Sequence, residues 1–165
     1  MKVLVFTLCQ VILAATFTCQ AQDHKPVRWY FDAKSIGKEE AMLTFTAVLE
    51  DGWHIYSQFM EEGGPLPTTF TFAPKSEYKR VGKVKEESKA ITSYNDIFMM
   101  DIIWYSNIAV FTQKVKLHAP SSTVKGKIEY MVCTDEMCLP PDVIDFSLDI
   151  KGESVAGATK SSYGR

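Results

Sequence analysis

The sequence predicts an all-β protein built as an antiparallel β-sandwich, and two observations lead to that prediction. Apolar residues recur at every second position in several segments between Val27 and Ile150, which is the period of a half-buried strand. No segment in that range keeps an apolar stripe at helical spacing for a dozen residues. Seven or eight short strands separated by turn residues are typical of two packed antiparallel sheets.

In the N-terminal half, strands are predicted from alternation and from turn residues. The segment 41–49 reads AMLTFTAVL, and its threonines and valine favour a pleated strand. Asp51-Gly52 supplies a turn before a strand that starts at 53–56, and a loop rich in Gly and Pro leads to a strand at 68–72. One face of the first of these strands carries Ala41, Leu43, Phe45, Ala47 and Leu49.

In the C-terminal half, strands are expected at 109–117, 128–132 and 143–150. The run of mixed charges at 79–89 is expected to form a solvated hairpin, and the small, polar residues 152–165 a frayed tail. The apolar faces of the three strands are formed by Ala109, Phe111, Val115, Leu117, Ile128, Tyr130, Val132, Ile144, Phe146, Leu148 and Ile150.

The first 21 residues have the layout of a secretory signal: a positive charge at Lys2, a short apolar core and a small-residue end at Ala21. We expect cleavage there and an exported domain at 22–151, with an uncleaved anchor or a lipid on Cys19 as alternatives. Cleavage leaves 17 basic against 20 acidic residues, a balance of −3. A net charge this small and negative does not indicate a basic surface for binding nucleic acid.

The remaining part of the chain contains two cysteines, Cys133 and Cys138, in the window VCTDEMCLPP. Cys133 follows the predicted strand 128–132, and the strand from Val143 must run back antiparallel to it. This reversal brings the two cysteines side by side, at a separation that suits a disulfide. The following Pro-Pro pair, 140–141, restricts the backbone and holds the segment extended.

The residues alone leave two interpretations of this pair open. Most cysteine pairs in exported domains are structural staples. Closing a six-residue loop, however, contributes only about 2 kcal/mol, and a disulfide in an exposed turn is accessible to an attacking thiolate. Metal binding is disfavoured because two thiolates fall short of the ligands that zinc needs, and no His lies in the window.

The hairpin CTDEMCLPP, with the preceding KIEYMV, resembles the active-site hairpin of the N-terminal, immunoglobulin-like domain of DsbD thiol:disulfide interchange proteins. The resemblance extends over about 27–150. Within it, DGWHIYSQ (51–58) is similar to an early strand of that family, and YNDIFMMD (94–101) to its cap loop.

The resemblance implies an immunoglobulin-like sandwich that relays electrons without a cofactor between thioredoxin-like proteins, with a separate membrane electron carrier as a further partner. It implies that Cys138 forms mixed disulfides and that Cys133 resolves them. Phe98 would cover the disulfide, with Met99 beside it in place of an aromatic residue, and Asp96 would disfavour a thiolate by like charge.

Three departures from the family pattern stand beside this resemblance. Ile97 replaces a second acidic residue, four residues instead of five separate the cysteines, and the best-known members continue into a membrane carrier and a thioredoxin-like domain.

Two rival functions remain: a binding module whose disulfide only staples a hairpin, and an envelope scaffold that has lost the redox role.

The aromatic residues Trp53, Tyr56 and Trp104 are most simply core or sheet-surface residues. The three histidines His24, His54 and His118 are scattered, none at a catalytic spacing from a cysteine or carboxylate, which disfavours a cysteine hydrolase.

Overall fold

The computed structural model describes residues 24–151, so the predicted signal segment 1–21 and the predicted polar tail 152–165 lie outside the described residues. The described range is all β, and it contains no helix that could cross a membrane. The strands are β1 (Val27–Gly37), β2 (Glu40–Leu49), β3 (His54–Tyr56), β4 (Thr69–Phe72), β5 (Tyr78–Glu86), β6 (Ile91–Asn95), β7 (Met100–Ser106), β8 (Ile108–Leu117), β9 (Ser121–Tyr130), β10 (Val132–Cys133) and β11 (Asp142–Lys151).

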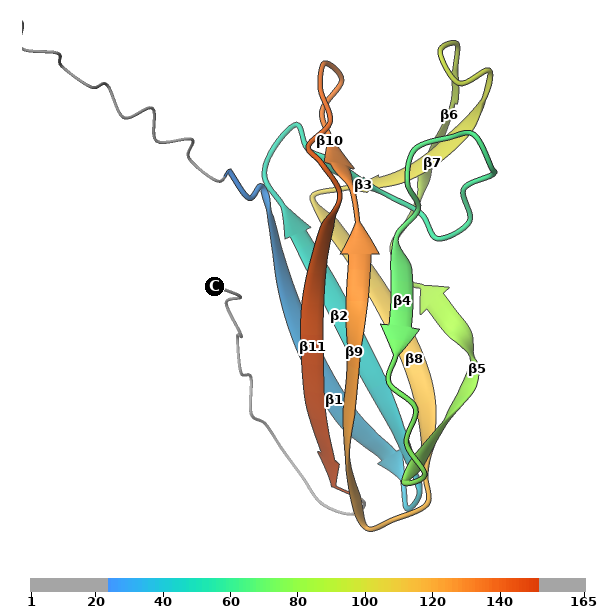
Figure 1. Ribbon diagram of the computed structural model, residues 1–165, viewed down its shortest axis with the longest axis vertical. Coiled ribbons are helices and arrows are strands. Elements are labelled where there is room, and N and C mark those ends of the chain that lie inside the picture. Colours follow the sequence, from blue (N-terminus) through green and yellow to red (C-terminus); the bar gives the residue numbers. More distant parts are fainter. Residues whose placement is uncertain (1–23, 152–165) are drawn as a thin grey trace, which may run out of the picture.

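Two antiparallel sheets form the body of an immunoglobulin-like sandwich (Figure 1). One has the order β1-β2-β8-β5 and the other β11-β9-β4. The predicted fold class is therefore confirmed.

A third sheet, of order β10-β3-β7-β6, lies at one end of the sandwich (Figure 1). Its strands extend strands of the body after short breaks: β3 follows β2 beyond the turn at Gly52, β7 precedes β8 at Asn107, and β10 follows β9 after Met131. Gly52 and Asn107 both have a positive φ, of 82° and 65°, a backbone conformation that glycine and asparagine adopt most readily. These breaks place the cysteine hairpin on a small sheet of its own.

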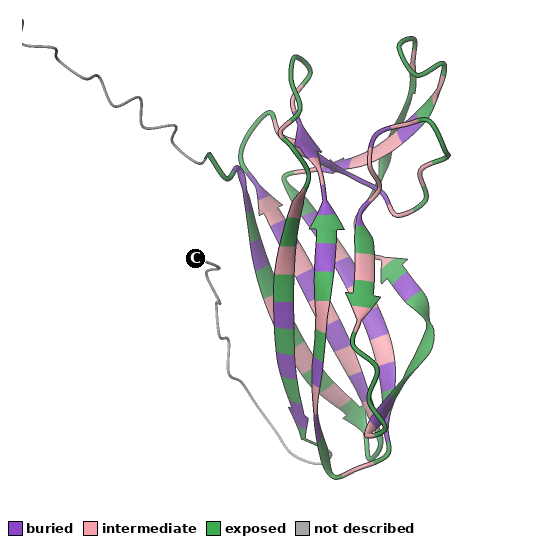
Figure 2. Cartoon of the chain, viewed as in Figure 1, coloured by how far each residue is buried: buried purple, intermediate pink, exposed green. Residues whose placement is uncertain are grey.

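The core fills the space between the two body sheets, and buried and exposed residues alternate along their strands (Figure 2). The apolar face predicted for 41–49 is confirmed, since all five of its residues are buried. Phe45 lies at the centre of an aromatic cluster, with the rings of Phe146 and Phe70 at centroid distances of 4.9 and 5.2 Å. Of the three C-terminal apolar faces, only Ile144 is half-buried, while the other residues are buried.

The charged run 79–89 is largely exposed, as predicted, but the prediction that it forms a hairpin is wrong. The segment lies mainly in the single strand β5, which pairs with β8 and has a register irregularity between Val81 and Lys85. At this irregularity the buried Gln113 of β8 donates its side-chain amide to the carbonyl of Val81, 3.1 Å away. Gly82, with a φ of 73°, lies in this irregularity of the strand. In the sequence, a glycine at such a bulge resembles the turn of a hairpin.

Glu86, at the end of β5, ties the body to the end sheet. Its carboxylate accepts hydrogen bonds from the Ser57 hydroxyl at 2.9 Å, from the Gln58 backbone N–H at 2.7 Å and from the Tyr105 hydroxyl. Ser57 is fully buried and follows β3, while Tyr105 belongs to β7. These bonds fix the two central strands of the end sheet against the body.

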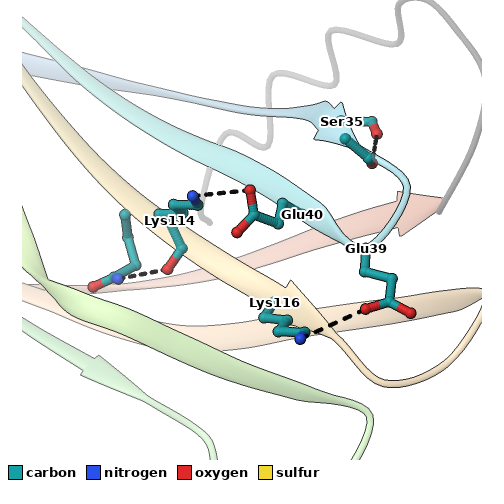
Figure 3. A network of polar contacts seen from close by, with 7 residues as sticks. Ser35, Glu39, Glu40, Lys114 and Lys116 are labelled. Atoms are coloured by element: carbon teal, nitrogen blue, oxygen red, sulfur yellow. Dashed lines mark hydrogen bonds and ion pairs between the residues drawn. The ribbon is translucent and has the colours of Figure 1, made fainter.

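The opposite end of the sandwich is charged and solvated. There Lys114 Nζ lies 2.8 Å from Glu40 and Lys116 Nζ lies 3.6 Å from Glu39, beside the turn that joins β1 to β2 (Figure 3). Exposed pairs of this kind contribute little to stability, about 0–1 kcal/mol. They keep this end polar, in contrast to the end that carries the cysteines.

Candidate functional site

The two cysteines close a hairpin at the tip of the end sheet. Cys133 is the last residue of β10, and its backbone bridges that of Cys138. The Thr134 N–H donates to the Met137 carbonyl at 2.7 Å, and the Leu139 N–H donates to the Val132 carbonyl at 3.0 Å. Inside the turn, the Thr134 hydroxyl accepts from the N–H of Glu136 and of Met137. This local bonding produces the reversal expected from the sequence.

Cys133 and Cys138 form a disulfide, with their α-carbons 4.0 Å apart. The two sulfurs have different surroundings, because Cys133 is 1% exposed whereas Cys138 belongs to the exposed residues of the turn. An attacking thiolate must approach one sulfur along the line of the S–S bond. Of the two cysteines, Cys138 is the one that lies open to solvent.

Cys133 packs in a small apolar cluster on the outer face of the end sheet, separate from the main core. Its buried neighbours are Tyr56 and Ile102. The half-buried residues around them are Met60, Met100, Trp104 and Met131. Of the six methionines between residues 24 and 151, only Met42 lies outside this end of the molecule. Flexible, polarisable methionine side chains are common at surfaces that adapt to several partners.

His54 lies directly across from Cys133 in the antiparallel pair formed by β3 and β10. Its Nε2 is 3.2 Å from the Tyr56 hydroxyl. The centroid of its ring lies 5.7 Å from that of the Trp104 ring. Burial lowers the pKa of His54 below 6.5, and the negative charge of Asp135 opposes this in part. Burial also raises the pKa of Tyr56.

The predicted cap residues lie in the turn between β6 and β7, and the structure does not bring this turn to the disulfide. The side-chain oxygen of Asn95 accepts hydrogen bonds from the N–H groups of Ile97 and Phe98, and Met99 has a positive φ of 54°. Asp96 and Met99 are exposed, and Phe98 is 40% exposed.

The sheet order explains the separation. The turn joins β6 to β7, which lie three and two strand spacings from β10, and these spacings amount to about 10–14 Å. In Figure 1 the β6–β7 turn and the cysteine hairpin project from the same end of the molecule as two separate tips.

A groove of about 400 Å³ lies behind the cysteine hairpin. It is lined by residues of the segment that leads into β1, of the end of β9 and of the Pro-Pro segment, among them Val27, Tyr130, Leu139, Pro140 and Asp142. The Tyr130 hydroxyl is 3.1 Å from Asp142, and burial together with this carboxylate raises the tyrosine pKa. Within residues 24–151, no group of three or more His, Cys, Asp or Glu side chains is arranged to hold a metal ion.

Sequence reasoning missed His54 and Glu86 as parts of this region. Alternation places His54 on the same face of its strand as Tyr56, but the pairing of β3 with β10 joins segments almost eighty residues apart. A strand pair of that kind leaves no signal in a single sequence. Glu86 was hidden in a charged run that reads as solvated surface.

A family model described as "Thiol:disulfide interchange protein DsbD, N-terminal" matches residues 21–150. Among the curated proteins, no match is found.

Two solved structures share the fold. The N-terminal periplasmic domain of ScsB from Proteus mirabilis matches with a TM-score of 0.55 and 15% identity, over 79% of this chain and 48% of that chain. This chain therefore spans about half the length of that relative. A chain from the complex between the DsbD N-terminal and PilB N-terminal domains of Neisseria meningitidis matches with a TM-score of 0.51 and 14% identity, over 74% of this chain and 82% of that chain.

Proposed function

Because the chain belongs to the family of N-terminal domains of the thiol:disulfide interchange protein DsbD, we propose that it relays electrons by thiol-disulfide exchange through Cys133 and Cys138. In this proposal, one thioredoxin-like protein reduces the disulfide and another is reduced by the resulting dithiol. The domain itself needs no cofactor for this reaction.

The proposed reaction has two exchanges in each direction. A thiolate of the reduced donor attacks the Cys138 sulfur, the Cys133–Cys138 bond breaks, and Cys133 leaves with the electron pair. The donor's second thiolate then attacks its own sulfur in the mixed disulfide and releases Cys138 as a thiolate. Delivery to an acceptor reverses these steps, with Cys133 as the resolving thiol.

The observation that carries the proposal is the unequal exposure of the two cysteine residues. An accessible Cys138 beside a buried Cys133 allows one sulfur to meet a partner while the other is kept for the resolving step. The apolar, methionine-rich surroundings offer a partner a surface on which to dock.

The proposed cellular compartment and the proposed partners are based on the similar proteins and on the predicted signal segment. The ScsB domain is described as periplasmic, and the DsbD domain of Neisseria meningitidis forms a complex with the PilB N-terminal domain. We place this chain likewise in the periplasm, exported by residues 1–21 and served by a separate membrane electron carrier. We also assign Phe98 and Met99 to a cap that shields the sulfurs between encounters, and Asp96 to the tuning of the thiols.

The Cys133→Ala variant tests the relay directly. Without its resolving thiol, Cys138 is expected to accumulate as a mixed disulfide with thioredoxin-like proteins, visible as a heavier band on a non-reducing gel. Cys138→Ala serves as the matched control and is expected to form far less of this adduct, because Cys133 is buried. Failure of Cys133→Ala to form any mixed disulfide would rule out the relay.

The reduction potential separates the relay from a binding module with a structural staple. A potential near that of thioredoxin, about −270 mV, agrees with exchange, whereas a value below about −300 mV is typical of structural disulfides.

A further inference from the structure

Reducing this disulfide creates a thiol in an unfavourable place. Cys133 is 1% exposed and packs against Tyr56 and Ile102, so a thiolate at this sulfur is poorly solvated. Desolvation disfavours the charged form of a thiol, yet only the thiolate attacks a disulfide. The resolving step therefore needs a group that takes the Cys133 proton where the sulfur lies.

His54 is positioned for this task. It faces Cys133 in the strand pair, and side chains at directly opposed positions have β-carbons about 5 Å apart. The half-buried imidazole is held by the Tyr56 hydroxyl at Nε2 and by contact with the Trp104 ring. When Nε2 carries the ring proton and donates it to Tyr56, the lone pair of Nδ1 is available.

We propose that His54 is the base that accepts the proton of Cys133 during the resolving step and returns it when the disulfide is reduced. This inference rests on the proposed function of the cysteine pair. In the forward step the Cys133 proton moves to Nδ1, and the sulfur attacks Cys138 in the mixed disulfide. The Cys133–Cys138 bond forms, the bond from Cys138 to the partner breaks, and the partner sulfur leaves as a thiolate with the electron pair.

The charged and titratable groups around the imidazole agree with a base that works near neutral pH. Tyr56 on the same strand is kept protonated by burial, which raises its pKa. Asp135, in the cysteine turn, stabilises the imidazolium once the proton has moved. The facing residue of β7 is Ser106, which carries no charge. Burial lowers the pKa of His54, which favours the neutral ring, the form that accepts a proton.

The test measures two rates by rapid quenching between pH 6 and 8.5: attack of the partner on Cys138, and the resolving attack of Cys133. The partner is a thioredoxin-like protein, used in a single-cysteine form and in its two-cysteine form. In the wild-type protein the resolving rate is expected to change little above the pKa of His54. In His54→Gln, it is expected to fall at least about tenfold at pH 6.5 and to rise about tenfold per pH unit, because the thiolate fraction alone then sets the rate. Attack of the partner on Cys138 should keep its wild-type rate.

Two controls keep the outcome clear. His118→Gln changes an exposed histidine far along the chain, after β8, and should leave both steps unchanged. His54→Asn, checked for wild-type circular dichroism, guards against a folding defect in His54→Gln. Equal resolving rates and equal pH profiles in wild-type and His54 variants would overturn the role of His54 while leaving the relay intact. Absence of mixed disulfides even with Cys133→Ala would instead overturn the relay.

Discussion

Gly126 is the residue at which the body of the sandwich tolerates no side chain. It lies in β9 between Phe72 of β4 and Phe146 of β11, its partners in the two neighbouring strands. A β-carbon at this position would overlap the Thr71 carbonyl oxygen and the Phe146 ring. Glycine in a strand interior often marks such a close approach, and here it lets the Phe146 ring reach Phe45 and Phe72.

We expect Gly126→Ala to lower the free energy of unfolding by about 1–3 kcal/mol, since either the backbone of β4 or the Phe146 ring must shift. Denaturation in urea measures the loss. Gly37→Ala is the matched control, because a β-carbon there would meet only the β-carbon of Glu40, at 3.9 Å. A variant of Gly126 as stable as that of Gly37 would contradict the packing described here.

Among the elements, the β6–β7 hairpin carries Phe98 and Met99, the residues that we propose as a cap for the disulfide. Strand β6 is the edge of the end sheet and pairs only with β7. Four of its five residues are exposed, and Asn95 is half-buried. An edge strand with so little buried surface is expected to open locally at a low free-energy cost, as the proposed cap requires.

If Phe98 caps the sulfurs between encounters, Phe98→Ala should raise the rate at which dithiothreitol reduces the disulfide several-fold. Removing the ring opens the approach to Cys138 without touching the sulfurs. Tyr94→Ala is the control. Alternation along β6 puts this exposed tyrosine on the face of the end sheet opposite to the face that carries Cys133. Equal rates in wild-type and Phe98→Ala would show that the turn stays apart from the disulfide in solution.

At the scale of the whole molecule, the main core and the disulfide lie in different parts of the structure. The main core lies between the two body sheets, whereas Cys133 belongs to the small cluster on the outer face of the end sheet. Glu86 holds the end sheet in place by hydrogen bonds that do not involve the sulfurs. We therefore expect the fold to persist when the disulfide is reduced.

Reduction is accordingly expected to lower the free energy of unfolding by about 2 kcal/mol, the chain-entropy contribution of a loop this short. Guanidinium unfolding followed by tryptophan fluorescence, with and without a reducing agent, provides the comparison. The reduced protein should keep a single cooperative transition. Loss of that transition on reduction would identify the disulfide as a structural staple.

The strand pattern of the sequence was sufficient for the fold class and for the hairpin. Alternation from residue 41 to 49 identified five buried residues, and the short spacing of Cys133 and Cys138 before two prolines predicted the disulfide that is present. These features are local, because a strand's two faces and a tight turn depend on residues next to one another in the chain.

Only the tertiary structure decided which residues surround the sulfurs. It placed His54 opposite Cys133, made Glu86 an anchor within a run that reads as solvated, and set the turn of Phe98 two to three strands away from Cys133. Each of these depends on the pairing of segments distant in sequence. Such pairing is determined by how the sheets pack as a whole, and a strand's own alternation carries no information about its neighbour.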